Sequence, residues 1–183
     1  MKKVIVFALL IAGMSHLNAQ NIYMTKDGQV SFSSQKSVEN IDAINNEVNS
    51  IINTQNGEMV FQALLKGFHF QRALMEEHFN ENYVESEKFP KSTFKGKISN
   101  VSAVNFSKDG SYPVKVEGDL TLHGVTKKVS APGTLVVKAG TIQASSKFNI
   151  KLKDFDVKIP SLVADKLSED VDVKVDCKYE LKK

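Results

Sequence analysis

Apolar and polar residues alternate strictly along three stretches of the chain. Between residues 112 and 122 the even positions are apolar or small, while the odd positions are mostly charged or polar. The same period of two recurs over residues 142–152 and 171–181, where valines alternate with charged residues in the last stretch. Successive side chains of a β-strand point to opposite faces, so each stretch predicts a strand with one buried face.

Weaker alternation and turn signals fill most of the remaining chain. The weaker strand signals lie at Gln29–Ser34, Val38–Ile44, Glu47–Asn53, Glu58–Lys66, Thr93–Val101 and Val125–Lys138. Dipeptides that place Gly where a hairpin needs positive φ are Asp27-Gly28, Asn56-Gly57, Asp109-Gly110, His123-Gly124 and Ala139-Gly140. The short connections favour antiparallel neighbours.

One segment follows a helical period instead. From Arg72 to about Tyr83, Leu74, Met75 and His78 recur at intervals of a helix, and the residues are good helix formers. This pattern predicts a short helix that crosses between strands. We interpret it as a plug over a barrel end or sheet edge, with a lid over a cavity as the functional alternative.

The strands must close or stack, because long strands with open edges invite aggregation. The pattern predicts an all-β protein, an antiparallel barrel of about eight strands with one short helix inserted. A two-sheet sandwich has the same periodicity and remains an alternative. A barrel of about eight strands can hold one small ligand, whereas a sandwich fills its centre with side chains.

The N-terminus has the layout of a secretory signal peptide. Lys2 and Lys3 precede an apolar run from Val4 to Met14, followed by polar residues and Ala19. A spanning helix needs about 20 apolar residues, so this run is too short to anchor the chain. We therefore expect a signal peptide at residues 1–19, one domain at residues 20–183, no integral membrane segment, and a periplasmic or secreted location.

Charge and residue types exclude several function classes. The chain has 24 Lys and Arg against 21 Asp and Glu; without Lys2 and Lys3 the count is 22 against 21, a net charge of +1. Nucleic-acid binding needs a clustered basic surface, and is not expected. The single cysteine, Cys177, excludes an intramolecular disulfide, and no histidine has a His or Cys partner at a ligand spacing. We expect no metal site, no cofactor and no catalytic residue.

Three stretches together resemble the YceI-like family of exported polyisoprenoid-binding proteins. They are Leu74–Tyr83 running into Lys88–Gly96, then Gly118–Lys127 with the sequence GDLTLHGVTK, and the region from Phe148 through Asp156 to Pro160. The three match in order and spacing over essentially the whole mature chain. The resemblance implies an extended lipocalin-like antiparallel barrel, and no enzyme activity.

The resemblance also implies a carrier or sequestering protein whose interior receives an isoprenoid or other long-chain apolar ligand. The residues expected to face that ligand are Phe61, Phe94, Tyr112, Val114, Val116, Leu120, Ala144, Phe148, Val173 and Val175. Small inward residues, namely Gly118, Ala144 and Ser146, favour an open interior. The His123-Gly124 turn is interpreted as a hairpin that sets strand register.

Two other functions remain open at this stage. A structural or interaction barrel would have a solidly packed core. A secreted enzyme would use an unrecognised carboxylate pair, such as Glu76 with a strand Asp, and at least one carboxyl pKa would be strongly raised. The sequence leaves the ligand's identity, partner proteins, physiological role and oligomeric state undetermined.

We expect the exported form to begin at Gln20, because Ala19 is the last small residue after the apolar run. N-terminal sequencing or the intact mass of secreted material measures this. A soluble cytoplasmic protein that retains residues 1–19 would contradict both the cleavage site and the compartment.

Overall fold

The computed structural model describes residues 21–36, 39–159 and 168–182. The expected signal peptide and cleavage site, and Pro160, lie outside these residues. The strands are β1 (Ile22–Lys36), β2 (Glu39–Asn53), β3 (Glu58–Leu64), β4 (His69–Phe70), β5 (Lys91–Ile98), β6 (Gly110–Leu122), β7 (Val125–Lys138), β8 (Thr141–Lys151) and β9 (Asp170–Leu181). One short helix, α1 (Ala73–His78), lies between β4 and β5. No helix in the described ranges is long and apolar enough to cross a membrane.

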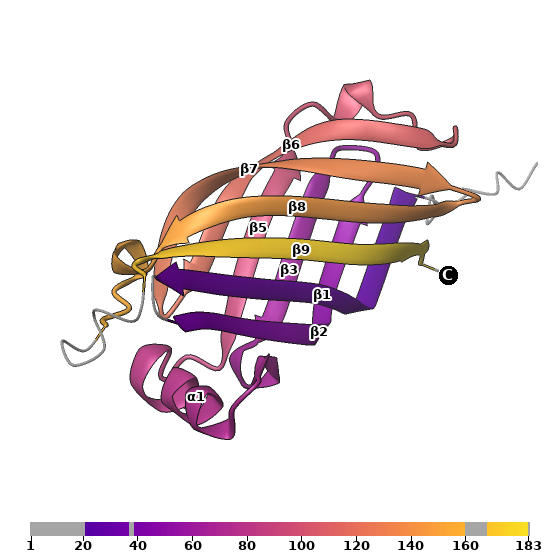
Figure 1. The fold of residues 1–183 in the computed structure, drawn as a ribbon. Helices are drawn as coiled ribbons and strands as arrows, with labels where there is room; N and C mark the ends of the chain where they lie inside the picture. Colours follow the sequence, from indigo (N-terminus) through magenta and orange to yellow (C-terminus); the bar gives the residue numbers. More distant parts are fainter. Residues whose placement is uncertain (1–20, 37–38, 160–167, 183) are drawn as a thin grey trace, which may run out of the picture.

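Eight of these strands form a closed antiparallel barrel (Figure 1). Their order is β1-β9-β8-β7-β6-β5-β3-β2, and β2 pairs with β1 to complete the ring. The two-residue strand β4 adds to β2. The expected barrel is therefore confirmed over the sandwich. Closure gives each of the eight strands a hydrogen-bonded neighbour on both sides, as the sequence argument required, although β7 pairs with β8 only from Gly133 to Lys138.

The three plainest alternating stretches correspond to β6, β8 and β9. Two of the weaker signals, 38–44 from residue 39 onward and 47–53, belong to the single strand β2. Its register against β1 shifts between Asn45 and Val48, which is a β-bulge. The inward face moves from odd to even positions at this bulge: Ala43 and Asn45 are buried before it, Val48 and Ile52 after it. This change of phase explains why the hydrophobic pattern of one strand was interpreted as two separate strand signals.

Three of the five predicted turns have the expected geometry, and two predictions were wrong. Gly57, Gly124 and Gly140 have φ values of 77°, 76° and 77°. Gly28 instead lies inside β1, at a register shift, where a Cβ would stand 2.7 Å from Cys177 Sγ. Gly110 is the first residue of β6. These two glycines mark a close packing point and a strand start rather than hairpin turns.

The helical segment covers one end of the barrel (Figure 1). α1 continues into a π-helical turn, Phe79–Tyr83, and the segment ends before Glu85, whose φ is +45°. The predicted helix from Arg72 to about Tyr83 is thus present in two parts. Strands β6 and β7 meet at the same end through the His123-Gly124 turn.

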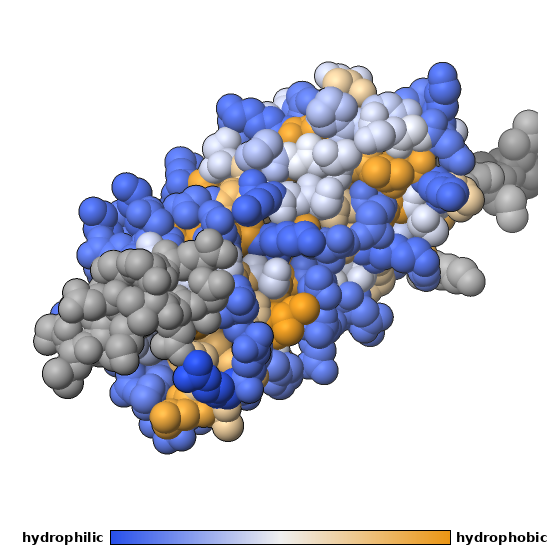
Figure 2. Space-filling view, in the orientation of Figure 1, coloured by the Kyte–Doolittle hydropathy of each residue, from blue (hydrophilic) through white to orange (hydrophobic). Residues whose placement is uncertain are grey.

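Side chains fill the opposite end of the barrel, which we call the packed end. Its largest fully buried members are Tyr179, Ile52, Ile98, Leu135 and Ile142. Cys177 lies among them as a buried free thiol, and burial raises the pKa of its thiol to about 11. The outer surface seen in Figure 2 is largely hydrophilic, with apolar atoms in separate patches.

We expect Gly124→Val to lower the free energy of unfolding by about 1 to 3 kcal/mol, because a β-branched residue is strained at positive φ. A Cβ at this position would also stand 2.5 Å from the Phe89 ring. Denaturant titration measures the loss. An unchanged midpoint together with lost ligand binding would show that the turn is a binding site and not a register device.

Candidate functional site

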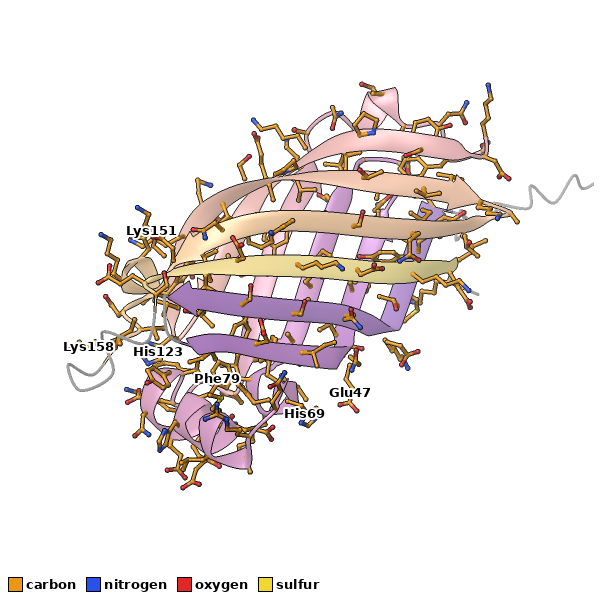
Figure 3. The ribbon with its side chains drawn as sticks, viewed as in Figure 1. Glu47, His69, Phe79, His123, Lys151 and Lys158 are labelled. Atoms are coloured by element: carbon orange, nitrogen blue, oxygen red, sulfur yellow. The ribbon has the colours of Figure 1, made fainter. Side chains whose placement is uncertain are left out.

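A deep apolar cavity of about 520 Å³ occupies the end of the barrel nearest α1. All eight barrel strands contribute to its wall, and the helical segment covers its end. In Figure 3, Phe79 lies where this segment meets the ends of β1 and β2. Small-molecule sites usually measure about 300 to 1,000 Å³, so the cavity has the size of a ligand site.

Nine of the ten residues expected to face a ligand line this cavity. They are Phe61, Phe94, Val114, Val116, Leu120, Ala144, Phe148, Val173 and Val175. Tyr112 does not line it. Its side chain is on the apolar face of β6 but lies at the packed end, where its hydroxyl donates to the Lys108 carbonyl at 3.0 Å.

The small inward residues have two different roles. Ala144 and Ser146 line the cavity, as expected. Gly118 pairs with Gly96 across β5 and β6, and the Phe94 ring covers both glycines. A Cβ on Gly118 would stand 2.7 Å from that ring and 2.5 Å from Gly96 Cα. Gly118 therefore makes room for an aromatic wall residue and not for a ligand.

Sequence reasoning missed the contributions of β1, β2 and the helical segment. Val30, Phe32 and Ile41 line the cavity from the first two strands, and Leu74 and Met75 from α1. Alternation in the weak 29–34 signal could have identified Val30 and Phe32. The α1 residues lack such a signal, because a helical period does not show which face of a helix packs against the barrel.

Four phenylalanines form a cluster at the end of the cavity beneath the helical segment. Phe79 has ring-centroid distances of 5.5, 5.8 and 5.1 Å to Phe32, Phe68 and Phe70. Phe32 also contacts Phe68 and Phe70, at 5.4 and 5.8 Å. The tilted and edge-on angles are those that aromatic quadrupoles favour. This cluster attaches the helical segment to the barrel and forms part of the cavity wall.

The cavity ends at the packed end, and we call this boundary its floor. Two polar side chains that are hydrogen-bonded to each other lie behind the floor. Tyr179 donates from its hydroxyl to Ser50 Oγ at 2.7 Å, and Ser50 donates to the Val60 carbonyl at 2.9 Å. Both residues are buried, and burial raises the pKa of Tyr179 well above its usual value. The phenol is therefore neutral at physiological pH and already paired, so it offers no free group to a ligand.

The titratable side chains in the lining are few. Arg72, His78 and Tyr83 are the titratable members, and none of the described lining residues is Asp, Glu, Lys or Cys. Three of the four exposed residues in the described lining, Arg72, Leu74 and His78, belong to the helical segment. The cavity thus reaches solvent beside this segment. The remaining exposed lining residue, Ser145, lies near the point where the β7–β8 ladder ends.

The enzyme alternative required a strongly raised carboxyl pKa in a cleft. Among the described residues, the carboxyl groups with a resolved pKa shift are Glu87, Glu117 and Asp172, and the pKa of each is lowered. The main causes are hydrogen bonds from Lys66 to Glu87, from Lys115 to Glu117 and from Asn149 to Asp172. These groups are on the outer surface, so the shifts reflect local pairing rather than an active site.

His69, His123 and Glu76 have structural partners. Glu76 Oε2 accepts from the Phe70 N–H at 3.2 Å and lies 3.5 Å from His69 Nδ1. His123 Nδ1 donates to the Phe155 carbonyl at 3.2 Å. Its Nε2 lies 3.4 Å from Glu85 Oε2. No group of three or more possible metal ligands occurs within the described part of the chain.

Solved structures of other proteins have a similar fold. The chain is similar to a polyisoprenoid binding domain from Saccharophagus degradans, with 17% identity, 89% of this chain and 99% of that chain covered, and a TM-score of 0.77. It is also similar to BcnA from Burkholderia cenocepacia, with 15% identity, 83% and 95% coverage and a TM-score of 0.64. The Campylobacter jejuni YceI protein matches at 16% identity over 100% of both chains, with a TM-score of 0.58.

These identities are low, so the likeness to solved structures shows the shared fold. A comparison with curated proteins found no match. The sequence model of the YceI-like domain matches residues 15–179, which is nearly the whole chain. The protein therefore belongs to the YceI-like domain family.

Proposed function

We propose that this protein is an exported carrier or sequestering protein that holds one long apolar chain inside its barrel and makes or breaks no bond in it. The apolar cavity of about 520 Å³ is the observation that carries the proposal. Burial of each methylene group is worth about 0.8 kcal/mol, so a long chain gains affinity from such a wall with few polar contacts.

The cavity disfavours the packed-barrel alternative. Protein interiors are close-packed, with few voids larger than one water molecule, whose share of liquid volume is about 30 Å³. A space of about 520 Å³ is far larger than such voids. An apolar cavity of this size loses dispersion contacts along its whole lining unless a ligand replaces them.

The class of ligand follows from the wall and from the structural relatives. An isoprenoid is the first candidate, because the Saccharophagus degradans neighbour is described as a polyisoprenoid binding domain. A fatty-acid-like chain has the same apolar character and is the second. Arg72 and His78 are the lining groups that can carry positive charge, so they suit an uncharged or anionic end group on either chain.

Mass spectrometry of an organic extract tests the carrier proposal directly. Protein purified from the exported fraction of its native cells should release a long apolar chain in near-stoichiometric amount. A protein that yields no lipid and binds no apolar fluorescent probe would contradict the proposal.

We expect Val116→Glu to abolish binding of a long-chain apolar ligand, because Val116 lines the cavity and a buried carboxylate costs several kcal/mol. The matched control is Glu117→Gln, one residue along β6. Glu117 is on the outer face, where its Oε1 lies 2.6 Å from Lys115 Nζ, so this variant should bind normally.

Displacement of a fluorescent fatty acid or prenyl probe measures binding by both variants, and thermal melting in parallel measures folding. Equal loss of binding in both variants would contradict the assigned facing of β6. Normal binding by a folded Val116→Glu protein would contradict the cavity as the binding site.

A further inference from the structure

We infer that the barrel sets the length of its ligand: it encloses one chain of about 16 backbone carbons, inserted tail first, and carbons beyond that number remain outside. This inference rests on the proposed function and deepens it. It follows from the closed floor, the depth and the volume of the cavity.

The floor closes the packed end against a ligand. Ile52, Ile142 and Tyr179 are at most 1% exposed and fill the barrel below the cavity. The segment between β5 and β6 covers this end from outside, where Val104 and Phe106 pack against the same cluster. A chain that enters near α1 therefore stops at the floor, where Val114, Leu135 and Ala144 belong both to the cavity wall and to this cluster.

The depth of the cavity can be read along β6. Its inward residues from Leu122 to Val114 line the cavity, except Gly118. This stretch covers about 26 Å at about 3.3 Å per residue, or about 20 Å along the barrel axis for a strand tilt of about 40°. An extended hydrocarbon advances about 1.25 Å per carbon, given C–C bonds of about 1.5 Å and angles of about 111°. About 16 carbons therefore reach from the mouth to the floor.

The volume of the cavity suits a single ligand. It measures about 520 Å³, within the range of about 300 to 1,000 Å³ for sites that hold one small molecule. We therefore assign one chain to the cavity, and the depth of the cavity sets the length of that chain.

The polar groups determine which end of the ligand enters first. At the floor, the hydroxyls of Tyr179 and Ser50 bond to each other and to the Val60 carbonyl, so a head group would find no partner there. An unpaired polar group in such a place costs free energy. Arg72 and His78 lie at the mouth. The tail therefore lies against the floor, and the head group stays beside the helical segment.

A series of saturated fatty acids, from about 10 to about 24 carbons, tests the limit by competition against a fluorescent fatty acid. We expect Kd to fall by up to about fourfold per added methylene, the equivalent of about 0.8 kcal/mol, until about 16 to 18 carbons, and then to become constant. Linear prenyl alcohols should reach their plateau at about four isoprene units, because each unit adds four carbons to the chain backbone.

Substitution at the floor should move the plateau. Val114→Phe adds bulk where the tail ends, so the plateau should occur roughly four carbons earlier; Val114→Ala should delay it by about two carbons. The control is Val136→Phe on the outer face of β7, which should leave the plateau unchanged. Thermal melting of each variant establishes that it folds.

The outcomes separate this inference from the proposed function. Affinity that keeps rising well beyond 18 carbons, or the same plateau in wild type and both Val114 variants, would overturn the length limit while chain binding itself persists. Failure of the wild-type protein to bind any chain of either series would overturn the proposed function as well. If Val114→Phe does not fold, the wild-type series and Val114→Ala decide the question.

Discussion

Closure of the barrel by the β1–β2 pair is the constraint on which the rest of this structure depends. Once β2 pairs with β1, every long strand has two hydrogen-bonded neighbours, and every second side chain must point inward. A ring of eight strands is wide enough either to be filled by side chains or to hold one small ligand. The residues at inward positions therefore decide, position by position, whether the interior is solid or hollow.

The interior is solid at one end of the barrel and hollow at the other. At the packed end the inward residues are bulky, such as Tyr179, Leu135 and Ile142, and the segment between β5 and β6 supplies further apolar side chains. Nearer α1 the inward residues of β8 and β9 include Ser146 and Val173, which leave space between the walls. Tyr179, Ile52 and Leu135 at the packed end are each at most 2% exposed, so this end supports a fold whose other end is hollow.

The sequence predicted which side of the sheet each residue faces, but it did not predict the position of a residue along the barrel axis. A period of two records which side of the sheet a residue occupies, so nine of the expected contact residues lie in the cavity. It carries no information on position along the barrel axis, which is why Tyr112 was placed in the cavity instead of the packed end. Gly118 was misread because the Phe94 ring that occupies its space is on another strand. Such contacts arise only when strands distant in sequence are brought together.

The helical segment combines the plug and lid interpretations, since it covers the barrel end and its residues Leu74, Met75 and Phe79 also line the cavity. α1 has six residues, none of them buried, and an isolated helix of that length is unstable in water. Its position depends on packing against the barrel, above all on the contacts of Phe79 with Phe32 and Phe68. A chain in the cavity would contact the same rings. Ligand binding and the placement of this segment therefore share one set of aromatic contacts, and a bound chain would stabilise the cover that encloses it.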